Sequence, residues 1–415
     1  ELDKDTWSYM PGTVGRSEQQ NYTTSKSNVN VENGNLVLSV TKREKEESNP
    51  RKPNGRTIKY DSGFINTSGK KDFLYGRIEM KAKLPKGKGA FPAFWLMGTS
   101  YGWPGGGEID IMELIGAPTT ERAENGETDP TDNARQSNQI IYGTPHFYYI
   151  NGDVDKDGSY DPYELGGNAK IEDDFWNEYH IFGIDWSPER IDWYLDGVIY
   201  NSMNLVGNER LEAAARSINR PQILKLNLAT GGDWAGDAGD YLADDNTSMT
   251  VDWIRWSQNK EQKKAAEAWY ADAPKLTGIT DIVIKEGTNY DVLSNVQVDR
   301  DDYVVNASID DEYMYTDTGE LKLVNTIDKN DISNLKPGIY NVHYSVVPKN
   351  KKLNNDGLAT GDIYKTLLKT ASLIILPESG LSGQSGAKLS TIKLPEGWAW
   401  EDDQLIIGEQ EFYKV

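Results

Sequence analysis

Short runs in which apolar and polar residues alternate recur along the first 258 residues, and this pattern constrains the fold more than any other feature. The clearest runs lie at residues 35–42, 75–84, 178–186, 190–200 and 249–257. A period of two indicates strands that bury one face, and the Gly, Pro and Asn residues between the runs favour turns. Helical spacing is rare before residue 258, with 208–218 as the one candidate. The pattern predicts an all-β fold, a sandwich of two antiparallel sheets that can bend into a cleft for an extended polymer.

One strand candidate, WPGGGEIDIMELIG at 103–116, carries three acids among apolar residues. Because strand side chains alternate between faces, Glu108 and Asp110 share one face, and a regular strand would send Glu113 to the other. We predict a one-residue bulge, at position 111 or 112, that returns Glu113 to the face of the other two.

The bulge would bring a pair of carboxylates within reach of each other. Four pleats separate the backbones of Glu108 and Glu113 by about 13 Å. Long side chains that lean together could reduce this to the roughly 5 to 5.5 Å of a retaining glycosidase pair. Repulsion among three carboxylates would raise at least one pKa and provide a general acid near neutral pH. The spacing alone also fits an acidic edge strand or a metal site.

The composition narrows the classes of partner. A net charge of -21 argues against nucleic acid and anionic membrane, since both are negatively charged. The 12 Trp and 23 Tyr suit sugar rings, although these residues also serve ordinary sheet cores. Without cysteine there are no disulfides and no Cys-ligated zinc. No apolar run is long enough to insert into a membrane. We expect a monomer, and we expect that residues before Glu1 have been removed.

Several ordered blocks carry a resemblance to a known family. They are YGRIEMKAKLPKGKGAFPAFWLMG (75–98), WPGGGEIDIMELIG (103–116), NLATGGDWAG (227–236) and TVDWIRW (250–256). Together they resemble glycoside hydrolase family 16, nearest its laminarinase-like branch, over about the first 258 residues. The resemblance implies a β-jelly roll that hydrolyses a β-glycan internally and with retention.

The resemblance also implies roles for the three acids. Glu108 corresponds to the nucleophile, Glu113 to the acid/base, and Asp110 to the residue between them that modulates their charge. Glu113 would protonate the leaving oxygen while Glu108 attacks the anomeric carbon, and Glu113 would then activate the water that releases the sugar.

Four further side chains would line the cleft by the same resemblance, as stacking platforms and hydrogen-bond partners. They are Trp95, Trp103, His146 and Trp234. Trp95, inside the apolar run AFWLM, also fits a place in the core. A lone histidine such as His146 also fits a purely structural role.

Two departures from the laminarinase-like pattern leave the sugar open. Members of that branch usually carry Asn shortly before the Glu that corresponds to Glu18, where this chain has Ser17. They commonly carry Arg where Phe64 stands. An Arg can donate two hydrogen bonds to sugar hydroxyls, whereas a Phe can only stack. We count Glu18 and Phe64 among the substrate-binding candidates, with mixed-linkage β-glucan and β-galactan as alternatives to plain β-1,3-glucan.

A second motif, DVDKDGSYDPYE at 153–164, has the spacing of an EF-hand calcium loop. Its predicted ligands are Asp153, Asp155, Asp157, Ser159, Asp161 and Glu164. We expect a structural calcium ion in this loop, without the paired helices, and no cofactor for catalysis. The alternative is an acidic surface insertion that binds nothing. By resemblance, the backbone of Gly34 and the carboxylate of Asp252 would hold another calcium ion.

The residues after 258 are predicted to form accessory segments outside the catalytic domain. Residues 259–275 are expected to form a charged, helical linker between the catalytic domain at 1–258 and a β-rich module at 276–377. The module resembles bacterial Ig-like surface domains, which act as spacers or glycan-contact modules. Residues 378–415 begin as a flexible linker and end in a short β-rich piece.

The sequence predicts a retaining endo-β-glycanase that is secreted or held at the bacterial cell surface. The first choice of substrate is β-1,3-glucan or mixed-linkage β-1,3-1,4-glucan. An endo-β-galactosidase for mucin-type or algal galactans is the alternative. A non-catalytic glycan-binding protein is the alternative of another class, although the presence of Glu108 and Glu113 argues against it.

Overall fold

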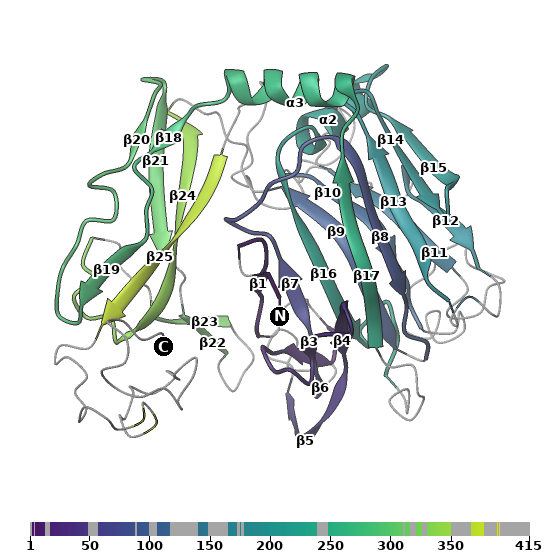
Figure 1. The fold of residues 1–415 in the computed structure, drawn as a ribbon, viewed down its shortest axis with the longest axis horizontal. Helices are drawn as coiled ribbons and strands as arrows, with labels where there is room; N and C mark the ends of the chain where they lie inside the picture. The colour runs from purple at the N-terminus through teal and green to yellow at the C-terminus, as the bar shows by residue number, and fades with distance from the viewer. Residues whose placement is uncertain are drawn as a thin grey trace. The chain divides into compact units, whose positions relative to one another are not determined.

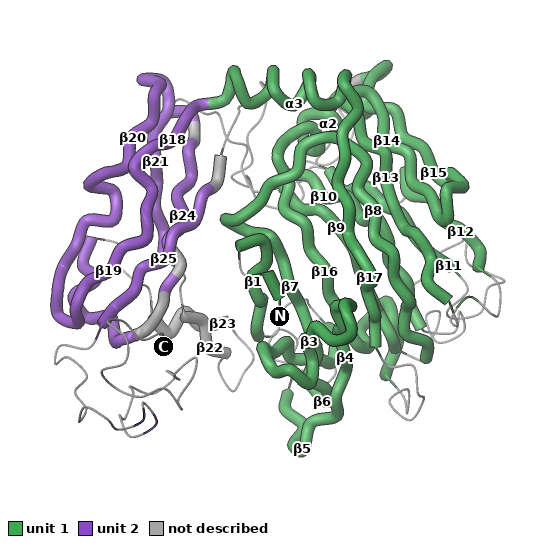
Figure 2. Tube along the Cα trace, viewed as in Figure 1, with its two compact units in different colours: residues 1–273, 314–322, 350–367 green, residues 274–313, 323–349, 368–415 purple. Residues whose placement is uncertain are grey.

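The computed structural model divides into two compact units (Figure 2), Glu1–Ala273 with Met314–Lys322 and Asn350–Leu367, and the remainder from Pro274 onward. The structure describes residues 2–3, 5–12, 17–48, 57–87, 89–98, 106–116, 140–147, 165–171, 175, 178–238, 248–309, 312–315, 321–325, 330–349, 367–376, 388 and 390.

Two seven-stranded sheets make up most of the first unit (Figure 1). From edge to edge, the first sheet contains β1 (Ser8–Tyr9), β7 (Phe64–Asn66), β16 (Gln222–Thr230), β9 (Ala90–Gly98), β10 (Glu108–Glu113), β11 (Ile140–His146) and β12 (Gly167–Lys170). The second contains β15 (Val198–Asn204), β14 (Arg190–Leu195), β13 (His180–Trp186), β8 (Gly76–Lys83), β17 (Ser248–Ser257), β4 (Asn35–Ser39) and β3 (Val29–Glu32). Every neighbouring pair within both sheets is antiparallel.

The core of this unit is built from the facing sides of the two sheets. On β9, Phe94 and Leu96 point inward and are fully buried, while Trp95 between them is only partly buried. Trp193 of β14 and Ile109 of β10 belong to the same buried cluster. Burying an aliphatic or Phe side chain of this kind contributes about 1.5–3 kcal/mol. The predicted sandwich of two antiparallel sheets is therefore confirmed.

One predicted strand run proves to be two strands. Residues 190–200 form β14 and the start of β15, joined by a tight turn at Asp196 and Gly197. Both turn residues have positive φ, 49° and 80°, which matches the twist of a two-residue hairpin. A third, smaller sheet of this unit contains β2 (Gln20–Tyr22), β6 (Thr57–Ser62) and β5 (Thr41–Ser48).

Two helices accompany these sheets. The predicted helix at 208–218 is α2 (Glu209–Ile218), and the Asn208 side chain caps it by accepting from the backbone N–H of Leu211. The stretch expected as a charged linker forms α3 (Lys260–Asp272), which begins with a capping box. Ala266 and Trp269 of α3 belong to the buried cluster of the first unit. This stretch therefore packs as part of that unit and is not a free linker.

The second unit is a small β-rich body with its own buried cluster. One sheet contains β19 (Ile282–Lys285), β25 (Leu367–Leu376), β24 (Gly338–Pro348) and β21 (Tyr303–Ile309). The strands β18 (Leu276–Thr277) and β20 (Gln297–Val298) pair separately. The strands β22 (Glu312–Tyr315) and β23 (Leu321–Asn325) also pair with each other, but their residues are divided between the two units. The likeness of this unit to Ig domains stays a prediction. None of the helices in the described part of the chain has the length and apolar character needed to cross a membrane.

Candidate active site

The predicted bulge is present in β10. Asp110 lies opposite Trp95 and Glu113 lies opposite Ala93, so three steps along β10 match two steps along β9. The register shift leaves Ile111 as the extra residue. Because Trp95 and Ala93 are two residues apart, they share a face, and Glu113 therefore stands on the same face as Asp110. The prediction is confirmed, at the first of the two positions it allowed.

Side chains of the other sheet hold the backbone at the bulge. Nε1 of Trp193 donates to the carbonyl oxygen of Asp110 at 2.8 Å, and the Tyr200 hydroxyl donates to that of Ile111 at 3.5 Å. A bulge disturbs the ladder and leaves such groups in need of partners. Gly143 on β11 makes room, because a Cβ there would lie 2.5 Å from both aromatic side chains. We call Trp193, Tyr200 and Gly143 the bulge clamp.

The register across neighbouring strands defines which side chains surround the three acids. Residues that lie opposite one another share a face of the sheet, and here they form three rows. The rows are Ile223–Met97–Glu108–His146, Asn66–Lys225–Trp95–Asp110–Thr144 and Phe64–Asn227–Ala93–Glu113–Tyr142. We call this side of the first sheet the acid-bearing face.

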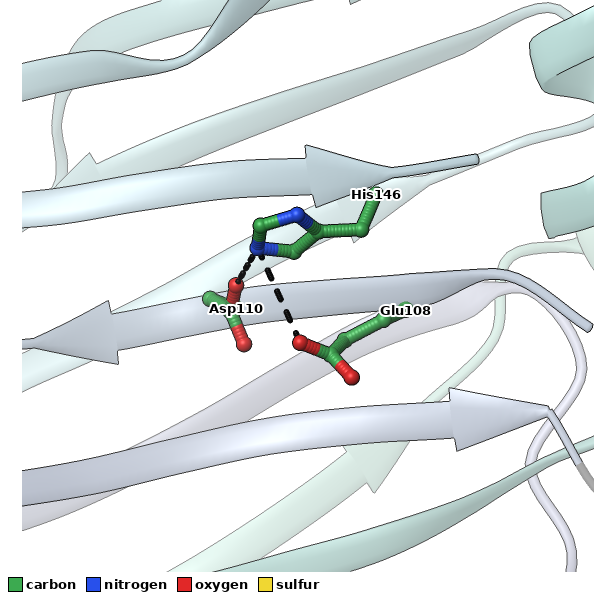
Figure 3. Close-up of side chains that lie close together, drawn as sticks. All are labelled: Glu108, Asp110 and His146. Carbon is green, nitrogen blue, oxygen red and sulfur yellow. Dashed lines mark ion pairs between the residues drawn. The ribbon is translucent and has the colours of Figure 1, made fainter. Parts of the chain in front are cut away.

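His146 joins two of the acids (Figure 3). Its Nε2 lies 2.8 Å from Oδ2 of Asp110 and 3.6 Å from Oε1 of Glu108. The contact with Asp110 has the distance of an ion pair, but Oδ2 accepts no aligned hydrogen bond within the described residues. Of the two roles left open for His146, the structure supports a place in the site.

The same three side chains are also arranged as metal ligands could be. One ligand atom each of Glu108, Asp110 and His146 lies within 4.8 Å of the others. An imidazole and two carboxylates suit several divalent cations. The geometry is thus compatible with both a metal site and an acid cluster, and the two predict different responses to chelation.

Burial gives two of the acids unusual proton affinities. Burial raises the pKa of Asp110 well above its ordinary value, because the charged form loses hydration. Burial also raises the pKa of Glu113, and the negative charges of Asp110 and Glu108 add to the effect while His146 opposes it. A carboxylic acid that keeps its proton toward neutral pH can act as a general acid. Glu113 meets that requirement.

Trp95 is held rigidly in the middle row of the acid-bearing face. Its Nε1 donates to Oδ1 of Asn227 at 2.7 Å, and Asn227 in turn donates to the hydroxyl of Tyr22 at 3.0 Å. The partly exposed ring can serve as a platform for a sugar.

Phe64 is an aromatic neighbour of Trp95. Only 1% of Phe64 is exposed, and its ring packs edge-on against Tyr22 at 5.1 Å and lies 6.1 Å from Trp95. A fully buried ring has no free face for a sugar. The prediction that Phe64 binds substrate directly therefore needs correction, because the side chain supports Trp95 instead.

Trp234 and Glu18 come together from distant parts of the chain. The Trp234 ring lies 5.2 Å from that of Tyr142, which stands opposite Glu113. The backbone N–H of Asp233 donates to the Ser17 hydroxyl at 2.8 Å, which ties the segment of Glu18 to the Trp234 turn. Trp234 thus contacts the residue opposite the acid/base candidate, and Glu18 belongs to the segment that is bonded to the Trp234 turn.

The remaining predictions are divided by what the structure describes. The following candidates lie outside the described residues: Trp103, Asp153, Asp155, Asp157, Ser159, Asp161 and Glu164. Gly34 lies in an exposed turn between β3 and β4. The exposed Asp252 carboxylate pairs with Nζ of Lys81 at 2.8 Å. The second calcium site, at Gly34 and Asp252, stays a prediction.

Sequence reasoning missed several residues of the face. Lys225 and Asn227 lie two residues apart in the strand QILKLNLAT. Two polar residues in an otherwise largely apolar strand could have indicated that this strand contributes to a site. The bulge clamp had no such signal, because its contacts join strands of different sheets.

Comparison with known proteins adds independent findings. Residues 16–255 match the family of glycosyl hydrolases family 16. The chain is 31% identical over 277 residues to glucan endo-1,3-beta-glucosidase A1 of Niallia circulans, a match that covers 61% of this chain and 36% of that protein. It is 30% identical over 267 residues to a beta-glucanase of Rhodothermus marinus, covering 61% of this chain and 79% of that protein. The match therefore spans little more than a third of the Niallia protein.

A solved structure from work on endo-acting O-glycanases, which prominent members of the human gut microbiota express to initiate mucin breakdown, is also similar. It aligns with a TM-score of 0.50 at 28% identity, covering 64% of this chain and 89% of that chain.

Proposed function

Because this chain belongs to glycosyl hydrolases family 16, we propose that it is a retaining endo-β-glycanase that hydrolyses internal bonds of β-1,3-glucan or mixed-linkage β-1,3-1,4-glucan. The single observation that carries the mechanism is the bulge at Ile111, which places Glu113 on the face of Glu108. The relatives from Niallia and Rhodothermus support a glucan as the substrate.

The two glutamates divide the chemistry. In the first step Glu108 attacks the anomeric carbon, and the proton of Glu113 passes to the leaving glycosidic oxygen, so the carbon–oxygen bond breaks as a glycosyl ester forms. In the second step Glu113, now a carboxylate, takes a proton from water. That water attacks the same carbon, breaks the ester and restores Glu108.

Asp110 and His146 prepare this pair. The charge of Asp110 helps to raise the pKa of Glu113, and it therefore favours the protonated acid. The His146 imidazole contacts both Asp110 and Glu108 and limits where these carboxylates can turn. In this assignment no metal ion takes part in catalysis.

A second candidate substrate is a β-galactan of the mucin or algal type. Two observations favour it: the similar structure is linked to mucin O-glycans, and Phe64 cannot donate the hydrogen bonds that Arg provides to sugar hydroxyls. The alternative keeps the same catalytic pair and changes only the sugar.

The decisive experiment measures product release from laminarin, lichenan, agar-type galactan and mucin glycans. We expect hydrolysis of at least one glucan by the wild type and none by Glu108→Gln, which removes the nucleophile. The Gln variant should still be retarded in an affinity gel that contains the polysaccharide. The exposed Glu32→Gln is the matched control and should retain activity. Unchanged hydrolysis by Glu108→Gln would sink the mechanism, and retardation without any wild-type hydrolysis would indicate a non-catalytic glycan-binding protein.

Three further properties complete the proposal. The 153–164 loop binds a structural calcium ion, supported by the spacing of its acids. The protein is secreted or held at the bacterial cell surface, as a polysaccharide substrate requires, and the second unit is an Ig-like spacer or glycan-contact module.

The calcium ion of the 153–164 loop is tested by chelation. Chelation should lower the melting temperature and leave the initial rate of the folded enzyme unchanged. A rate that chelation abolishes reversibly at unchanged melting temperature would instead place a metal ion at Glu108, Asp110 and His146.

A further inference from the structure

Lys225 stands in the middle of β16, in QILKLNLAT, and only 6% of its surface is exposed. It is the one ionisable residue in β16 and in the two strands that flank it, β7 and β9. Burying an ammonium group costs free energy unless a counter-ion or several acceptors satisfy it. Burial accordingly lowers the pKa of Lys225 to about 8, while the charge of Glu108 acts in the opposite direction.

The ammonium group has weak partners for its three N–H donors. Its Nζ donates to Sδ of Met97 at 3.3 Å, and sulfur is a weak acceptor. The same atom lies 4.3 Å from the ring centroid of Trp95 and 5.7 Å from that of Phe64. Such rings attract a cation but do not accept directed hydrogen bonds of normal strength. Within the described residues, Lys225 forms no ion pair with a carboxylate.

Lys225 faces the region where substrate would lie. It stands opposite Trp95, which stands opposite Asp110, so Lys225 belongs to the middle row of the acid-bearing face. The titratable groups on this face are the acids of β10, of which Glu108 acts on Lys225, and His146 and Tyr142 on β11. The protein thus keeps a poorly satisfied cation beside its aromatic platform.

We propose that Lys225 binds substrate, donating hydrogen bonds from its ammonium group to hydroxyl oxygens of the sugar that rests at Trp95. This inference rests on the proposed glycanase function and adds a residue that determines which sugar is accepted. The ligand is a neutral pyranose, because the negative charge of Glu108, which acts on Lys225, would repel sulfate and carboxylate groups. The sugar hydroxyls supply the acceptors that the protein lacks at this position, and the indole supplies an apolar surface for the ring.

The variant Lys225→Met distinguishes a role of Lys225 in binding substrate, which predicts a higher KM, from a role in stabilising the fold, which predicts a lower melting temperature. Met has a similar length and no charge, so it removes the burial cost, and the melting temperature should rise by about 2 °C or more. If Lys225 binds the sugar, the KM for the preferred oligosaccharide should rise about 10- to 100-fold, as expected for the loss of hydrogen bonds from a charged donor. The kcat should change little if the contact is equally strong in the ground state and the transition state.

The pH dependence adds a readout that packing alone would not change. Lys225 is protonated below about pH 8 and loses its charge above it, so the KM of the wild type should rise on the alkaline side. Lys225→Arg keeps its charge throughout, and its KM should stay flat there. Lys81→Met, which removes an exposed lysine of the other sheet, should change neither KM nor its pH profile.

Direct binding separates this inference from the proposed function. Retardation by neutral polysaccharide is compared between Glu108→Gln and the double variant Glu108→Gln/Lys225→Met. Weaker retardation of the double variant supports the role of Lys225, even if the wild type hydrolyses no polysaccharide and the proposed function fails. Equal retardation, together with a KM for Lys225→Met within twofold of wild type, overturns the inference. Loss of binding to sulfated oligosaccharides alone would overturn the assignment of a neutral sugar.

Discussion

Two strands of the first unit, β10 and β17, each contain a one-residue bulge at or next to an acid, and only the bulge of β10 lies in the candidate site. In β17 the register with β8 shifts between Val251 and Trp253, which leaves Asp252 as the extra residue. Asp252 is exposed and pairs with Lys81 at 2.8 Å. In β10 the acid beside the bulge, Asp110, is only 3% exposed.

The difference shows that a bulge next to an acid is not sufficient for catalysis. On β17 the carboxylate of Asp252 is exposed to water and paired with the Lys81 ammonium group, an arrangement that contributes little free energy. On β10 the carboxylate of Asp110 is removed from water, and the imidazole of His146 is its basic partner. Burial and the negative charges of Asp110 and Glu108 raise the pKa of Glu113, as the proposed general acid requires.

The largest effect should follow from removing that proton. Glu113→Gln keeps the size of the side chain but cannot donate to the leaving oxygen, and general acid catalysis contributes about 10²- to 10⁴-fold. We expect kcat on the preferred glucan to fall by that amount. An aryl glycoside with a good leaving group needs less protonation and should lose much less activity. Equal losses on both substrates would contradict the role of Glu113 as the acid.

The bulge clamp should show the next largest effect. Trp193→Phe removes the hydrogen bond to the Asp110 carbonyl and leaves that buried group unsatisfied, at a cost of about 1–3 kcal/mol in the free energy of unfolding. Because the bulge sets the position of Glu113, kcat should fall even at temperatures where the variant is fully folded.

Trp186→Phe is the matched control for the clamp. Trp186 is another fully buried tryptophan of the second sheet, and its Nε1 donates to Asn219 at 3.1 Å, away from β10. We expect a similar loss of stability, measured by urea denaturation, with kcat preserved. If both variants lose kcat in proportion to their stability, the clamp has no specific effect on the site.

Removing the charge of Asp110 should shift the pH dependence of kcat/KM. Ionised Asp110 raises the pKa of Glu113, so Asp110→Asn should lower that pKa. The general acid must be protonated, and the alkaline limb of kcat/KM, which reports the free enzyme, should therefore move to lower pH. A profile of kcat/KM against pH checks the direction, and a shift to higher pH would contradict the coupling.

Features of β10 and its neighbours that follow local rules could be predicted from the sequence, whereas features that depend on contacts between strands could not. The spacing of Glu108, Asp110 and Glu113 was enough to predict the bulge, because side-chain alternation is a local rule. Phe64 was misjudged because its burial depends on the side chains of other strands. The lone Lys225 was visible in an apolar strand, but its lack of a carboxylate partner depends on the three-dimensional arrangement. The contact of Trp193 with β10 also crosses between sheets, which no local pattern encodes.

The smallest effect belongs to the exposed bulge. Asp252→Asn removes a surface ion pair with Lys81, and such pairs contribute about 0–1 kcal/mol because water and salt screen them. We expect the free energy of unfolding to change within that range, with a smaller change at high salt, and kcat and KM to remain at wild-type values. A large loss of stability would show that β17 depends on its acid as strongly as β10 does. In that case exposure alone could not explain why only one bulge became a site.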